Sequence, residues 1–140
     1  MNTEVTPERM LTELDYARIT RLVRVARDTS RGGVDSAIDD ALDKADLVAP
    51  RGVAPHVVTM NSHVLLKDLE TGEEHRWILC YPSRADWQSG LISVLSPAGA
   101  GLLGRSVGSV ARWTVPTGAK RSAEVLAILF QPEASGNYVL

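Results

Sequence analysis

The chain has 140 residues, of which 44% are hydrophobic and 23% charged, and its 15 lysines and arginines nearly balance 17 aspartates and glutamates. This composition is typical of one folded domain with at most a small appendage, and it excludes intrinsic disorder and a dedicated nucleic-acid coat. Cys80 is the only cysteine, so no internal disulfide can form. No secretory signal and no apolar run of membrane-spanning length is visible. We therefore expect a cytoplasmic protein without a membrane partner.

The first fifty residues have the apolar spacing of two short helices. Thr12 and Asp15 fit a capping box, in which the hydroxyl accepts a bond from a free backbone N–H and the carboxylate reaches back to the cap. Apolar residues recur at helical spacing over 16–26 and again over 34–45, on either side of a Gly32-Gly33 turn. Neither stripe can be buried alone, so the pattern predicts an antiparallel helical hairpin, a short coiled coil.

The two predicted helices carry charges of opposite sign. Arginines rise along the first helix and aspartates crowd the second, which favours exposed salt bridges between them, each worth only a fraction of a kcal/mol. The carboxylates nearest the turn are Asp28 and Asp35. These two residues are the candidates for presentation to a partner at the coil tip.

Beyond Pro50 the helical period gives way to that of strands, which predicts two domains, residues 1–50 and 51–140. The connections between the predicted strands are too short for most parallel crossovers, so we expect a mostly antiparallel sheet and an α+β fold class. The predicted elements are strands at 57–60, 64–69, 77–81, 91–95, 110–115 and 122–130, a turn at 70–73 and one short helix at 97–103.

Two glycine motifs match catalytic signatures but lack the context that the chemistry needs. Residues 99–104 fit the G-x-G-x-x-G dinucleotide fingerprint, but the next predicted strand begins at Val110, which leaves no room for the required crossover helix. Residues 104–108 fit the G-x-S-x-G nucleophile elbow, but here the helix precedes the motif and the strand follows it. The histidines and Cys80 lack metal-ligand spacing. We expect no catalytic residue, no cofactor and no metal site.

The block from Ser96 to Gly108, S-P-A-G-A-G-L-L-G-R-S-V-G, resembles the signature of the C-terminal domain of the bacterial Gre transcript-cleavage factors. Similarity continues in the segments 58–62 and 131–138 and around the start of the first helix, so it covers nearly the whole chain. Within the GreA/GreB superfamily the chain is most similar to the Rnk-like branch. The resemblance implies an FKBP-like fold for the C-terminal domain.

The resemblance also implies a partner, bacterial RNA polymerase. Gre-type proteins dock their globular domain at the rim of the secondary channel and point the coiled coil inward, where acidic tip residues help to hold a Mg²⁺ ion. Rnk-like members have a shorter coil and compete with Gre factors without stimulating cleavage. The Ser-Pro of the Gre polymerase contact corresponds to Ser96 and Pro97, with Ala98 adjoining and Leu95 at a position that an acid can occupy.

The predicted helices have about 12 to 15 residues each, hence lengths of about 18 to 22 Å, so Asp28 and Asp35 would stop short of the catalytic metal. We therefore expect a non-enzymatic regulator of transcription elongation that is monomeric and makes no sequence-specific contact with nucleic acid. Two alternatives stay open. One is an FKBP-like peptidyl-prolyl isomerase. The scattering of the aromatic residues along the sequence argues against it, because an FKBP pocket is lined with aromatic rings. The other is a regulatory protein-binding module unrelated to polymerase.

Overall fold

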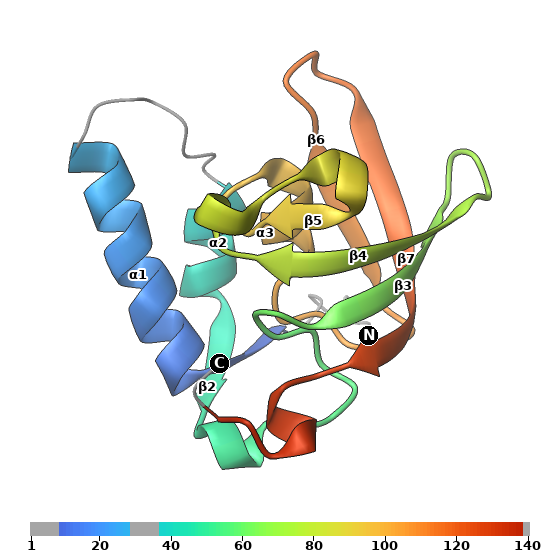
Figure 1. The fold of residues 1–140 in the computed structure, drawn as a ribbon. Helices are drawn as coiled ribbons and strands as arrows, with labels where there is room; N and C mark the ends of the chain where they lie inside the picture. The colour runs from blue at the N-terminus through green and yellow to red at the C-terminus, as the bar shows by residue number, and fades with distance from the viewer. Residues whose placement is uncertain (1–8, 29–36, 139–140) are drawn as a thin grey trace, which may run out of the picture.

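The computed structural model describes residues 9–28 and 37–138, and within them it has the expected mixture of helices and strands (Figure 1). The chain order is β1 (Arg9–Thr12), α1 (Glu13–Asp28), α2 (Ala37–Asp43), β2 (Ala45–Val48), β3 (His63–Asp68), β4 (Glu74–Cys80), β5 (Leu91–Ser93), α3 (Pro97–Leu102), β6 (Val110–Thr114) and β7 (Lys120–Phe130). Short 3-10 turns lie at Pro50–Gly52, Pro82–Arg84, Trp87–Ser89 and Glu133–Ser135. The α+β class predicted from the sequence is confirmed.

The first helix begins where the capping pattern places it. The Thr12 hydroxyl accepts a hydrogen bond from the Asp15 N–H at 3.0 Å, as predicted. The Asp15 carboxylate is buried, where it hydrogen-bonds the Thr12 side chain and accepts a further bond from the Met60 N–H, at 3.1 Å. The carboxylate therefore joins α1 to a distant loop.

The second helix ends earlier than predicted, since α2 stops at Asp43 and the chain is already extended at Ala45. There β2 pairs in parallel with β1, in a two-stranded sheet that was not predicted. Each strand has only four residues, too few to show an alternating pattern. The predicted Gly32-Gly33 turn and Asp35 lie outside the described residues.

A buried arginine fastens β1 to the second half of the molecule. The Arg9 guanidinium donates hydrogen bonds to the carbonyls of Ala100, at 2.6 Å, and Leu103, at 2.9 Å. These carbonyls stand at the C-terminal end of α3, where helix carbonyls lack partners of their own. Burial, with a smaller contribution from the neighbouring Arg105, lowers the pKa of Arg9 to about 10.

Five strands form the main sheet, in the order β5-β4-β3-β7-β6. Its pairs are antiparallel as predicted, except that β5 runs parallel to β4, because the connection 81–90 with its two 3-10 turns carries the chain from Cys80 back beside Ile78 before β5 begins. The strand predicted at 57–60 is wrong. Only Val57 makes a bridge, to Ser106, while the N–H groups of Val58 and Thr59 bond to the Arg105 carbonyl and the Ser62 hydroxyl.

Helix α3 packs against both edge strands, β5 and β6, so the sheet curls around it (Figure 1). The approach is closest at Gly99, where a Cβ atom would stand 1.9 Å from the Ser93 carbonyl oxygen. Only glycine fits this position without displacing backbone. The close packing of Gly99 against Ser93 thus fixes the start of α3 relative to the end of β5.

One hydrophobic core contains side chains from both predicted domains. Ile19 and Ile38 come from the helices, and Val64, Leu102 and Val125 come from the sheet and α3. All five side chains are at most 1% exposed. The division of the chain at residue 50 stays a prediction.

Candidate functional site

The predicted partner contact lies at the start of α3. The Ser96 hydroxyl accepts a hydrogen bond from the Gly99 N–H at 3.1 Å and donates one to the Ser93 carbonyl at 2.7 Å. Pro97 occupies the first turn of the helix, where its missing N–H costs no hydrogen bond. Ser96, Pro97 and Ala98 are half-buried and form one wall of a surface cavity. We call these three residues the 96–98 rim.

Leu95, the fourth residue assigned to this contact, faces the interior. Its side chain is 9% exposed and packs in the hydrophobic core. It therefore has little surface to offer a partner. We correct the assignment accordingly and retain only the 96–98 rim as the proposed contact.

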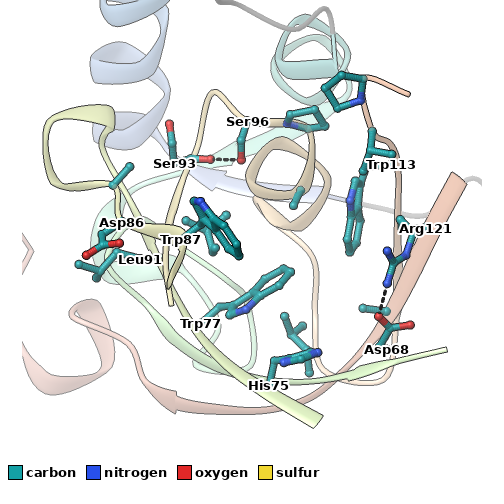
Figure 2. A pocket seen from close by; sticks show the side chains of 18 residues that line it. Asp68, His75, Trp77, Asp86, Trp87, Leu91, Ser93, Ser96, Trp113 and Arg121 are labelled. Carbon is teal, nitrogen blue, oxygen red and sulfur yellow. Dashed lines mark hydrogen bonds and ion pairs between the residues drawn. The ribbon is translucent and has the colours of Figure 1, made fainter. Parts of the chain in front are cut away.

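The cavity beside the rim has a volume of about 920 Å³ and is lined by all three tryptophans of the chain (Figure 2). Trp77 comes from β4, Trp113 from β6 and Trp87 from a 3-10 turn. The ring centroids of Trp77 and Trp113 lie 6.1 Å apart, and His75 stacks on Trp77 at 5.9 Å. Further apolar side chains of the lining include Leu66, Leu91, Ile92, Val115, Pro116 and Ala123. We call this cavity the tryptophan pocket.

The three tryptophans are scattered along the sequence, but the inference that they line no common pocket is wrong. Trp77 and His75 are two residues apart on one strand, so their shared face could be predicted from the alternation of a strand. Their proximity to Trp113 depends on how the sheet curls. Trp87, 75% exposed, depends on a turn that joins a parallel pair of strands. Neither the curl of the sheet nor the position of Trp87 could be predicted from the sequence pattern.

Two carboxylates and one guanidinium belong to the lining of the tryptophan pocket. At one end Arg121 donates a hydrogen bond of 2.6 Å to Asp68 and lies 3.6 Å from a Glu70 oxygen. The hydrogen bond to Asp68 raises the pKa of Arg121 above its ordinary value. At the other end Asp86 accepts a hydrogen bond from the Ser89 hydroxyl at 3.0 Å. Arg121 is therefore already paired with two carboxylates of the chain, those of Asp68 and Glu70.

The proposed coil tip is only partly described. Asp28 is exposed and is the last residue of α1, while Asp35 lies outside the described residues. Near Asp28, Arg27 makes a bidentate ion pair with Asp39 of α2, with distances of 2.6 and 3.0 Å. This hydrogen bonding lowers the pKa of Asp39. The predicted attraction between the two helices is thus observed for this pair.

Within residues 9–28 and 37–138, no three His, Cys, Asp or Glu side chains are grouped so that they could hold a metal ion. Cys80 is buried between strands, and burial raises the pKa of its thiol. In this described part of the chain, no helix combines the length and apolar character that crossing a membrane requires.

Comparison of the sequence with known proteins identifies two groups of relatives. Residues 53–130 match the family described as "Transcription elongation factor, GreA/GreB, C-term". The chain is 36% identical over 134 residues to the "Regulator of nucleoside diphosphate kinase" of Escherichia coli K12, covering 96% of this chain and 98% of that one. It is 35% identical over 92 residues to "Transcription elongation factor GreA" of Thermotoga petrophila, covering 66% of this chain and 58% of the other.

A solved structure has a similar fold. The "Prokaryotic transcription elongation factor GreA/GreB from Nitrosomonas europaea" superimposes with a TM-score of 0.69 at 29% identity, covering 88% of this chain and all of the other. The similarity thus extends beyond the C-terminal segment and includes most of the described helices and strands.

Proposed function

Because the chain belongs to the GreA/GreB transcription elongation factor family, we propose that it is a non-enzymatic regulator that binds bacterial RNA polymerase through the 96–98 rim. The observation that carries the proposal is the family match over residues 53–130, which contains this rim at an accessible surface. Several of its relatives are named as transcription elongation factors. Docking at the secondary channel and an FKBP-like C-terminal domain are parts of the proposal taken from the family resemblance.

The helices support a role without stimulation of transcript cleavage. At 16 residues, α1 spans about 24 Å, and α2 is less than half as long. Metal-assisted cleavage needs carboxylates within about 2 to 2.6 Å of the ion. In the Gre pose, a helix of this length starting at the channel rim would leave Asp28 short of the polymerase metal. We propose that the protein occupies the Gre site and competes with Gre factors there.

A backtracked transcription complex tests both parts of the proposal. Added protein should leave cleavage at the basal rate of the polymerase, and an excess should suppress the stimulation caused by a Gre factor. Suppression tests the shared site, and the absence of stimulation tests the length of the helices. Stimulated cleavage that is lost in an Asp28→Asn or an Asp35→Asn variant would contradict the non-catalytic role.

A second candidate, peptidyl-prolyl isomerase, is favoured by one observation. The tryptophans gather in a single pocket, which removes the argument that the aromatic residues are scattered. An aromatic pocket alone does not establish this activity. Isomerisation of a proline-containing peptide, measured with the protein and with a Trp113→Leu variant, decides the matter, since an enzyme would lose its rate enhancement in the variant.

A further inference from the structure

The tryptophan pocket brings together rings from three separate parts of the sequence around one cavity. Figure 2 shows the indoles of Trp77, Trp87 and Trp113 disposed around its interior, below Ser96. Trp87 is the most exposed large hydrophobic residue described, at 75%. A tryptophan so exposed beside two others gives a ligand several indole faces at once. Such an arrangement suits a ligand with both apolar and cationic character, because indole has the strongest attraction for cations among aromatic side chains.

The charges of the lining point in the same direction. Arg121 is held by Asp68 and Glu70, so its positive charge is more than compensated. Asp86 has a hydroxyl partner in Ser89 and no ion pair with any residue of 9–28 or 37–138. His75 also faces the cavity, and a Glu73 oxygen lies 3.9 Å from its Nε2 atom. The carboxylates thus outnumber the guanidinium at the pocket, which favours a cation over an anion.

We propose that the tryptophan pocket binds an arginine side chain presented by a protein partner. A guanidinium is planar and weakly hydrated, so it stacks on indole faces more readily than an ammonium group does. The carboxylates supply the complementary charge. The identity of the partner as RNA polymerase rests on the proposed function, because the pocket adjoins the 96–98 rim. The preference for arginine does not rest on it.

The test uses two soluble probes that differ in charge and hardly in shape, Nα-acetyl-arginine amide and Nα-acetyl-citrulline amide. The full chain is labelled with ¹⁵N, and its three indole N–H signals all report on this pocket. At constant ionic strength, the arginine probe should shift at least two of these signals and bind at least about fivefold more tightly than the citrulline probe. Equal binding of the two probes, or binding of neither, overturns the proposal.

Two variants locate the binding. Trp87→Leu keeps an apolar side chain at an exposed position, and it should weaken binding of the arginine probe by about threefold or more. Leu129→Ala, at a side chain that is 50% exposed and outside the pocket, should leave binding unchanged. Unchanged binding in Trp87→Leu would place the arginine elsewhere and overturn the proposal. A circular dichroism spectrum confirms that each variant is folded.

Polymerase binding, measured separately, distinguishes the two hypotheses. Polymerase binding without arginine selectivity overturns the pocket assignment and leaves the proposed function intact. Arginine selectivity without polymerase binding overturns the proposed function and supports the pocket as a site for a different protein.

Discussion

The carboxylate of Asp15, on α1, accepts a hydrogen bond from the backbone N–H of Met60, 45 residues further along the chain. Asp15 is 2% exposed, and burial raises its pKa to about 6, with a smaller contribution in the same direction from Glu133. The Met60 bond and the nearby Arg18 act in the opposite direction. A carboxylate with this pKa titrates close to physiological pH while it joins α1 to the loop that precedes β3.

Asp15 should make the protein less stable at neutral pH than in mild acid. The folded pKa of about 6 lies above the ordinary value of 3.8, so the folded state holds this proton more tightly than the unfolded state. The corresponding stability is fully present below about pH 4 and is lost as the pH rises through 6. Its upper limit is about 3 kcal/mol, from about 1.4 kcal/mol for each unit of pKa.

Urea unfolding of the Asp15→Asn variant measures this contribution. The free energy of unfolding of the parent, relative to the variant, should fall by about 1 to 3 kcal/mol between pH 4 and pH 7. Asp46→Asn, at an exposed position, should follow the parent at every pH. A parent and an Asp15→Asn variant that run in parallel across this range would show that Asp15 titrates normally.

The shared core leads us to expect that the helices and the sheet unfold together. All three tryptophans lie in the β-rich segment, whereas α1 and α2 supply much of the helical signal, so fluorescence and far-ultraviolet circular dichroism observe different halves. The two urea curves should coincide. Ile19→Ala should shift both by the same amount, with a loss of about 2 to 5 kcal/mol. Separated curves would instead support independent units divided near Pro50.

Gly99→Ala should strongly destabilise the protein. The added Cβ would stand 1.9 Å from a backbone oxygen of Ser93, so α3 or the end of β5 must move. We expect a loss of about 3 kcal/mol or more in the free energy of unfolding, measured with urea. Gly52→Ala is the matched control, because its Cβ would have ordinary contact at 3.9 Å. Similar effects of the two substitutions would mean that α3 can shift without cost.

Pro97→Asp should weaken polymerase binding while leaving the fold intact. An acidic residue in the first turn of a helix is favourable for the helix, so α3 should persist. An unpaired charge in a desolvated contact should cost about 1 to 3 kcal/mol of binding energy. Ala134→Asp introduces the same charge at an exposed site in a different turn and should bind as the parent does. Equal affinities of the two variants would remove the 96–98 rim from the interface.

The sequence predicts the turns and helix caps that are held by contacts between residues close together in the chain. The turn after β3 is an example, because the Asp68 side chain accepts bonds from the N–H groups of Glu70 and Thr71, and Gly72 has a φ of 80°. The cap of Ser96 on α3 is another. The pairing of β1 with β2 joins residues 36 positions apart and could not be predicted from either four-residue segment.

The candidate site divides in the same way. The Ser96-Pro97 pair is a local motif, and the sequence predicts both its helix cap and its family resemblance. The tryptophan pocket is a consequence of sheet order, since Trp77 and Trp113 lie on strands separated by β3 and β7 and meet only because the sheet curls around α3. Leu95 was assigned to the surface contact but is buried, because the exposure of a segment between two elements depends on what packs over it.

The parallel pairing of β1 with β2 brings the chain back beside the strand from which it left for the helices. The register from Arg9 opposite Ala45 to Thr12 opposite Val48 fixes both attachment points, and neither depends on how many turns lie between them. Equal insertions into α1 and α2 would lengthen the two helices and leave the strand pair from which they start unchanged. A chimera carrying extra heptads in both helices should therefore keep the stability of the rest of the fold. The strand pair is thus a junction at which the length of the helices can be varied alone.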